Sequence, residues 1–248
     1  MRRHNPIFSE QTALSPNCIA MDWLHILALG IFLYFANCFI HQLVANDVFG
    51  PKGTTRHERE IGVMTELKAL MIRWKARELK AGRKHTLPDG LTQGMLGKRG
   101  STMSLSGAEA NGFLRFLMQC VVPTLRDKLV GGMWEDMLTA GDGLLPMLNI
   151  LTDHKSRLPL AVVQRFHDAF QVAERAMKAL DIPFVPKRHM TAHLVVDLWW
   201  LGAPAAFATW KDEQYNGFLK LIALRAHFTV WHSRLLSAYR RGYASPHT

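Results

Sequence analysis

The chain has 248 residues, of which 48% are hydrophobic and 20% are charged. This composition is typical of a folded globular protein, excludes a disordered polyelectrolyte, and supplies enough apolar residues for a large core. The 30 basic and 20 acidic side chains give a formal net charge of +10 at pH 7. A polyanion such as nucleic acid is a natural partner for such an excess.

Cysteine usage and the first residues bear on the cellular compartment. Cys18, Cys38 and Cys120 form no Cys-x-x-Cys pair, which argues against a disulfide framework and against a zinc knuckle. Arg2 and Arg3 are followed by polar residues and not by the apolar core of a secretory signal. We therefore expect a reducing intracellular location, the nucleus or the cytoplasm.

Residues 1–50 are predicted to hold one short strand, at residues 18–21, and one long helix, Leu24–Ala45. The helical segment has no charged side chain and is long enough to span a bilayer. It also carries four polar side chains that are costly in lipid: His25, Asn37, His41 and Gln42. No basic cluster flanks it, so we favour a buried core helix and keep a membrane anchor as the alternative.

Residues 51–185 are predicted to form a helical and basic region. Apolar residues recur every three to four positions at about 57–81, which predicts an amphipathic helix, and a basic loop follows at 82–100. Residues 51–100 carry 12 basic and 5 acidic groups, so most of the excess charge lies here. A nucleic-acid surface and a solvated helix face explain this pattern equally well. The candidate nucleic-acid contacts are Arg73, Lys75, Arg77, Lys80, Arg83, Lys84, Lys98 and Arg99.

The rest of the chain is also expected to be helical. Ser106 and Glu109 have the spacing of a capping box and predict a helix to about residue 129. The glycines at 131–132 and 141–143 are expected to interrupt the chain, and Pro159 to open a helix to about residue 180. Residues 186–248 are predicted to hold helices at 187–200 and 210–239. The fold class is therefore mainly α, a helical bundle.

Two acidic positions are candidates for metal binding. Asp22 follows the predicted strand, where a carboxylate is placed to hold a divalent cation, although helix N-capping is the default explanation. Asp212 and Glu213 begin the last helix, where the helix dipole also favours acidic residues. If one of these two carboxylates faces Asp22, the pair would share a metal ion. Asn216 lies three residues after Glu213 and so on the same helix face.

His189 and His193 form the third candidate site, because residues four apart in a helix project the same way. The spacing suits zinc, but the intervening glutamate of a metalloprotease helix is missing. A hydrogen-bonded histidine pair, or one histidine contacting a phosphate or carboxylate, is favoured. The sequence contains none of the nucleophile-elbow, phosphate-loop and dinucleotide-binding motifs.

Four stretches, in this order, resemble the C-terminal part of a eukaryotic CACTA-type, transposon-derived transposase-like family. They are CIAMDWLH (residues 18–25), LTQGMLGKRG with GAEA (91–100 and 107–110), PKRH with His193 (186–189), and GAP with FATWKDEQYN (202–204 and 207–216). Leu24 stands where the family usually has methionine. The supporting residues carried over by the resemblance are His25, Lys187, His189, His193 and Asn216.

The resemblance implies a ribonuclease-H-like core that uses three carboxylates and two Mg²⁺ ions. Asp22 would be the second carboxylate and Glu213, or Asp212 in its place, the third, with residues 51–185 as a helical insertion. Only Glu10 is acidic before Asp22, so the first carboxylate and several strands are lacking. We therefore expect a truncated, catalytically incomplete DNA-binding chain that a separate N-terminal segment would complete. The alternatives are a membrane-associated protein and a helical interaction domain without chemistry.

Overall fold

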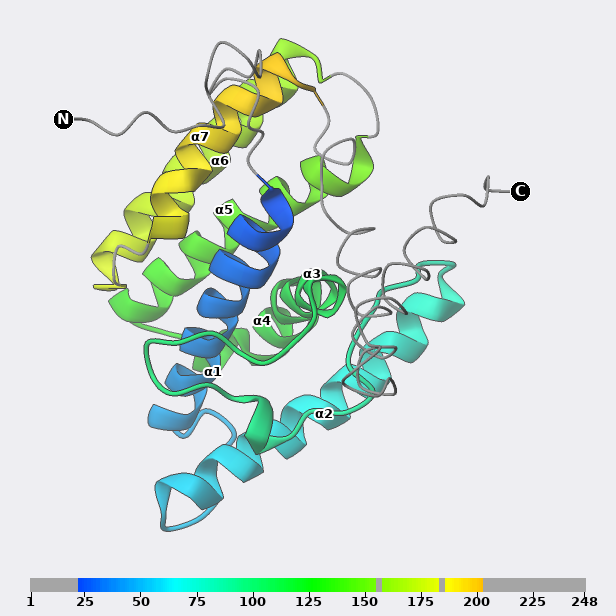
Figure 1. Ribbon diagram of the computed structural model, residues 1–248. Coiled ribbons are helices and arrows are strands. Elements are labelled where there is room, and N and C mark those ends of the chain that lie inside the picture. The colour runs from blue at the N-terminus through cyan, green and yellow to red at the C-terminus, as the bar shows by residue number, and fades with distance from the viewer. Residues whose placement is uncertain (1–21, 155–157, 183–185, 203–248) are drawn as a thin grey trace, which may run out of the picture. The chain divides into compact units, whose positions relative to one another are not determined.

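A computed structural model of the chain describes residues 22–154, 158–182 and 186–202 (Figure 1). Chain contacts divide the protein into two compact units, residues 1–207 and residues 208–248, and the second unit lies outside the described residues. The described residues form helices and connecting loops without a strand, so the predicted mainly helical class is confirmed. The strand predicted at 18–21 lies outside them, and the ribonuclease-H remnant stays a prediction.

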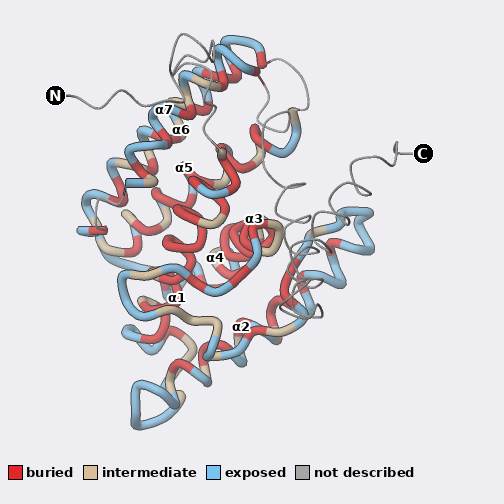
Figure 2. The backbone as a smooth tube through the Cα atoms, in the orientation of Figure 1, coloured by how far each residue is buried: buried red, intermediate tan, exposed pale blue. Residues whose placement is uncertain are grey.

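The predicted long apolar helix is present as two consecutive segments. A π-helix, η4 (Leu24–Phe32), leads directly into the α-helix α1 (Leu33–Ala45). Most of its side chains are buried, as Figure 2 shows. Within the described part of the chain this is the one helix long and apolar enough to cross a membrane, and 83% of its most apolar window is buried inside the protein. Such burial is typical of a core helix, and the membrane alternative stays a prediction.

The amphipathic helix predicted near 57–81 is α2 (Arg56–Lys80). It begins at a capping box in which the Thr55 side chain accepts from the Glu58 amide and the Glu58 side chain accepts from the Thr55 amide. Its buried stripe includes Met64, Leu67 and Trp74, spaced for one helix face. The opposite face is exposed (Figure 2).

The predicted basic loop crosses α1 before the next helix begins (Figure 1). It contains one short 3₁₀ turn, η5 (Gln93–Met95). The helix α3 (Gly107–Phe116) then starts at the predicted capping box of Ser106 and Glu109. It continues through a π-turn, η6 (Leu117–Val121), α4 (Val122–Leu125) and a 3₁₀ turn, η7 (Arg126–Lys128), and so ends close to the predicted position.

The prediction that glycines interrupt the chain at 141–143 is wrong. The helix α5 (Gly132–Asp153) runs through them without a break and packs along α6 (Leu160–Ala179). A Cβ atom on Gly143 would lie 2.7 Å from both the Ala169 carbonyl oxygen and the Ala173 nitrogen of α6. The glycine is therefore needed for close approach of two helices, and packing outweighs its poor helix propensity.

The last described helix, α7 (Pro186–Trp200), matches the predicted helix at 187–200 and packs against α6 and η4. Arg188 is buried and joins α7 to α6, because its Nε and Nη2 donate to the two Glu174 carboxylate oxygens at 2.9 and 2.6 Å. Lys187 joins α7 to η4, since its Nζ donates to the Leu29 carbonyl oxygen at 3.3 Å. The Lys187 stem lies against Gly30, where a Cβ atom would come within 2.5 Å of it.

Candidate nucleic-acid interface

All eight side chains predicted to contact nucleic acid are exposed. Six of them lie on the second half of α2 or directly after it, and Lys68 on the same helix is also exposed. Within the described part of the chain no ion pair is formed by five of these cations: Lys68, Arg73, Lys75, Lys80 and Lys84. The Arg77 Nε lies 3.9 Å from the Glu78 Oε1, which is a long contact. We call these six the α2 basic face: Lys68, Arg73, Lys75, Arg77, Lys80 and Lys84.

The α2 basic face has an order that follows from helix geometry. Arg73, Arg77 and Lys80 are three or four residues apart and line one side of the exposed surface. Lys68 and Lys75, seven residues apart, line the other. Between the two lines lie exposed apolar residues, including Ile72 at 56% and Leu79 at 60% exposure. Two rows of cations flanking a strip of apolar surface can contact phosphates on both sides of a nucleic-acid backbone.

Arg83 is also exposed, but a carboxylate of α2 compensates its charge. Its Nε and Nη2 donate to the two Glu78 oxygens at 2.6 and 2.9 Å, and the His85 Nε2 lies 3.2 Å from the same carboxylate. The hydrogen bonds from Arg83 lower the pKa of the Glu78 carboxyl to about 2, because together with the His85 contact they outweigh the effect of burial. His85 in turn stacks on Trp74, with ring centroids 4.8 Å apart.

This arrangement shapes the end of α2 into a hollow. A concavity of about 350 Å³ lies between the last turns of the helix and the segment that follows. Its walls carry the side chains Lys75, Glu78, Leu79, Arg83, Lys84, His85 and Thr86. Since Glu78 is already paired with Arg83, the charge available in the hollow to an incoming anion comes from Lys75 and Lys84.

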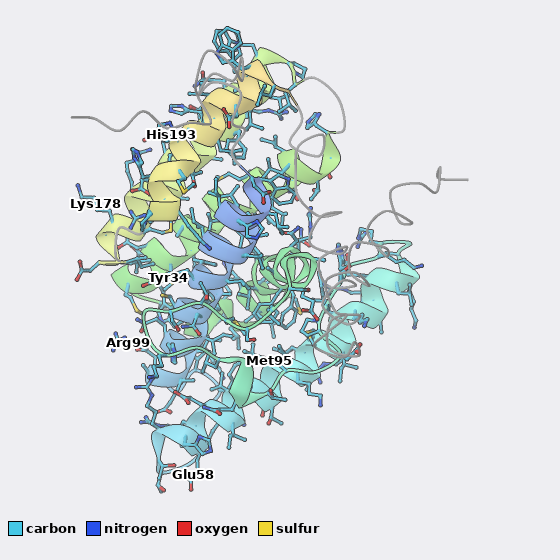
Figure 3. The ribbon with its side chains drawn as sticks, in the orientation of Figure 1. Tyr34, Glu58, Met95, Arg99, Lys178 and His193 are labelled. Carbon is cyan, nitrogen blue, oxygen red and sulfur yellow. The ribbon has the colours of Figure 1, made fainter. Side chains whose placement is uncertain are left out.

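Lys98 and Arg99 lie at a different place from the other predicted contacts. Arg99 lines a pocket with Arg56 and Arg59 of the first turn of α2. Figure 3 labels Arg99, and Glu58 of that same turn. A rise of 1.5 Å per residue puts that turn about 30 Å along the helix from Lys80. The structure therefore separates the predicted contacts into two groups, one at each end of α2.

Asp22, the predicted metal ligand, has the geometry of a helix cap. Its Oδ1 accepts from the Leu24 amide at 3.1 Å, and its carbonyl oxygen accepts the first helical hydrogen bond from Ile26 at 3.1 Å. Its Oδ2 forms an ion pair with His25 Nδ1. Each contact uses one lone pair of the carboxylate, which is the N-capping arrangement expected as the default explanation for Asp22.

The proposed partners of Asp22 are Asp212, Glu213 and Asn216, and all three lie outside the described residues. Within the described ranges, no group of three or more His, Cys, Asp or Glu side chains is placed to hold a metal ion. The Mg²⁺ site and the catalytic roles of Asp22 and Glu213 therefore stay predictions from the family resemblance.

The histidine pair on α7 is brought together as the spacing predicted. His189 Nε2 and His193 Nε2 are 3.1 Å apart on the exposed side of the helix. This is the hydrogen-bonded pair that the sequence favoured over zinc. Lys187, predicted as a supporting residue, contributes to packing between α7 and η4.

Of the two cysteines that the structure describes, Cys120 is buried in the core, whereas Cys38 is half-buried and lines a pocket. Burial raises the pKa of the Cys38 thiol to about 11, although the nearby charge of Arg99 acts in the opposite direction. Burial also raises the pKa of Cys120. A thiol that stays protonated at neutral pH is a poor nucleophile. Cys18 lies outside the described residues.

Sequence reasoning missed the side chains that fix the position of the basic loop. Asn37 of α1 is fully buried, and its Nδ2 donates to the carbonyl oxygens of Lys98 and Ser101 at 2.9 and 3.0 Å. Its Oδ1 accepts from the Gly97 amide at 3.0 Å, and His41 Nε2 lies 2.9 Å from the Gly97 carbonyl oxygen. The available signal was a pair of polar residues, four apart, inside an apolar helix.

Comparison of the chain with protein-family models, with curated proteins and with solved structures found no match. The geometry of the described residues therefore carries the functional argument.

Proposed function

We propose that this chain binds nucleic acid, with DNA as the expected form, through the α2 basic face. The observation that carries the proposal is the row of exposed cations on the second half of α2. Arg77 has one long contact, with Glu78 at 3.9 Å, and Glu66, the carboxylate near Arg73, is paired with Lys52. Glu78 lies in that region too, but it is buried and paired with Arg83. The net charge of this surface is therefore free to attract phosphates.

Binding on this surface would depend on the backbone of the nucleic acid. Lysine and arginine side chains on a helix neutralise phosphates and release counterions, which gives affinity without base recognition. The hollow at the end of α2 offers Lys75 and Lys84 to one phosphate, and Arg73, Arg77 and Lys80 line the other side of the helix. We infer a low-specificity contact, as expected for a transposase-derived chain that is catalytically incomplete.

The test is the salt dependence of binding, measured by fluorescence anisotropy with a labelled DNA duplex across a range of NaCl concentrations. The logarithm of affinity should fall linearly with the logarithm of salt, with a slope of about −0.9 for each phosphate contacted. The triple variant Arg73→Gln/Arg77→Gln/Lys80→Gln should lose affinity and reduce the slope by about 2 to 3.

The matched control removes the same three charges from another exposed helix face. Arg165, Arg175 and Lys178 are exposed on α6, and Figure 3 labels Lys178. The variant Arg165→Gln/Arg175→Gln/Lys178→Gln lowers the net charge equally and should keep the salt slope. Equal loss in the two triple variants, or binding that does not respond to salt, would refute the proposed surface.

A further inference from the structure

A second group of arginines surrounds a small pocket at the other end of α2. The pocket has a volume of about 130 Å³ and lies between the second half of α1, the first turn of α2 and the loop at residues 97–101. Arg56, Arg59, Arg99 and His41 line it, and the other lining residues are uncharged. Within the described part of the chain no carboxylate lines this space. Two carboxylates outside the lining contact its arginines: Glu60 contacts Arg56, and Asp47 contacts Arg59. We call it the arginine pocket.

The arginines keep unused hydrogen-bond donors. Arg56 uses its Nε on Glu60 Oε1 at 2.9 Å, and Arg59 has one long contact, with Nη1 3.8 Å from Asp47 Oδ2. The Nε of Arg59 is buried and has no hydrogen-bond partner among the described residues. Arg99 forms no ion pair within the same residues. Because each guanidinium carries five N–H donors, most of the donors around the arginine pocket remain available to an anion.

The elements that present these side chains are held in place. Asn37 and His41 bind the backbone of the loop on both sides of Lys98 and Arg99, and the Thr55–Glu58 capping box fixes the first turn of α2. Arginines on fixed backbone lose less entropy when an anion binds, and their planar groups match the oxygens of phosphate.

A larger pocket adjoins the arginine pocket and shares Gln42 and Arg99 with it. Its volume is about 550 Å³, within the range of small-molecule sites. Tyr34 and Met137 contribute an aromatic and an apolar side chain to its lining, and the carboxylates of Asp136 and Asp181 line it as hydrogen-bond acceptors. Figure 3 shows Tyr34 on α1 and Arg99 in the loop that crosses it.

We propose that the two pockets together bind a small organic phosphate. The phosphate group lies in the arginine pocket between Arg59 and Arg99, and the organic part lies in the larger pocket against Tyr34. The volume of the arginine pocket is sufficient for one phosphate group. Along α2, Arg59 is about 14 Å from Lys68, the nearest residue of the α2 basic face, and about 30 Å from Lys80, and the two sites share no residue.

The test is isothermal titration calorimetry of the full chain with inorganic phosphate, ribose 5-phosphate, phenyl phosphate and adenosine 5′-monophosphate. At least one organic phosphate should bind about tenfold or more tightly than inorganic phosphate, because its organic part buries further surface. Arg99→Gln and Arg59→Gln should each weaken that binding by about tenfold or more, as expected for a charge-assisted hydrogen bond.

The matched control is Lys98→Gln, which removes one positive charge at the neighbouring exposed position and touches neither pocket. It should bind the same ligand as the parent chain does. Circular dichroism and urea unfolding confirm that each variant is folded. The proposal is overturned if no phosphate of the series binds, if no organic phosphate exceeds inorganic phosphate, or if Arg99→Gln and Lys98→Gln lose affinity equally.

A second comparison separates this site from the nucleic-acid surface. The variant Arg73→Gln/Arg77→Gln/Lys80→Gln should keep its affinity for the organic phosphate while it loses DNA binding. Loss of organic-phosphate binding in this variant would mean that the anions bind on the α2 basic face, and would overturn the assignment to the two pockets.

Discussion

Single buried polar residues determine where the charged segments of this protein lie. Asn37 has no exposed surface, yet all three of its side-chain hydrogen bonds reach the backbone at residues 97–101. A buried side-chain amide is tolerated because each bond gives a hydrogen-bond partner both to the Asn37 amide and to a backbone group of the loop. The loop that carries Lys98 and Arg99 is therefore fixed by a neutral side chain on a different element.

Replacing Asn37 with alanine should destabilise the protein by about 2 kcal/mol, because the Gly97 amide and the Ser101 carbonyl lose their buried partner. The Lys98 carbonyl still accepts from the Ser101 amide and hydroxyl. Urea unfolding followed by circular dichroism measures the change. Asn46→Ala is the matched control, since Asn46 is exposed and bonds only to Gln42, one turn earlier. Its cost should stay within about 0.5 kcal/mol. Equal costs for the two variants would contradict the role given to Asn37.

Glu78 links stability to pH. Its pKa is lowered from 4.5 to about 2, so its contribution is fully present above about pH 4.5 and is lost as the pH falls through about 2. Glu78→Gln should cost about 1–2 kcal/mol at pH 7, a value reduced for solvent screening because Arg83 is 59% exposed. Urea unfolding at several pH values should show the parent and variant converging below about pH 4. A constant difference down to pH 2 would contradict this assignment.

Among the elements, the pair of α5 and α6 depends on a close backbone approach. Gly143→Ala should destabilise the protein by about 1–3 kcal/mol, because the added Cβ meets backbone atoms of α6 that cannot rotate away. Gly132→Ala is the matched control, since nothing lies within 4 Å of its added Cβ. That variant should be neutral or slightly more stable. Thermal unfolding compares the two, and a stabilising Gly143→Ala would show that the helices can separate.

Local sequence patterns predicted where the helices lie, but they predicted less well how the helices pack against one another. The Ser106–Glu109 capping box and the spacing of Met64, Leu67 and Trp74 act within one helix, so the sequence alone identifies them. Gly143 was misjudged because the reason for a glycine there lies on another helix. The Thr55–Glu58 capping box was visible in the sequence and was overlooked.

The candidate site shows the same limit. The exposure of the α2 cations follows from the amphipathic pattern and was predicted. The pairing of Arg83 with Glu78 depends on how the chain turns after α2 ends at Lys80. The position of Arg99 beside Arg59 depends on how the loop returns to the first turn of α2. The spacing of residues within one segment does not reveal such contacts. The sequence analysis therefore grouped Arg83 and Arg99 with the exposed cations of α2, although Arg83 is paired with Glu78 and Arg99 lies in a different pocket.

On the scale of the whole molecule, the apolar helix Leu24–Ala45 is the feature on which the membrane alternative depends. Its length and composition suit a bilayer, but Asn37 and His41 bind a loop from within it. We expect sodium carbonate at high pH to release the expressed chain from membranes into the supernatant, because its apolar side chains are covered by other helices. Retention in the membrane pellet, beside a released peripheral marker, would favour the anchor.

The attachment of the basic loop to α1 also sets an order of folding events. The bonds from Asn37 to Lys98 and Ser101 join positions 61 and 64 residues apart, and the chain between them includes all of α2. Helix α2 forms through contacts between neighbours, whereas closing so long a segment first costs entropy. The Asn37 bonds should therefore form after the folding transition state. In stopped-flow measurements, Asn37→Ala should speed unfolding and leave the folding rate nearly unchanged.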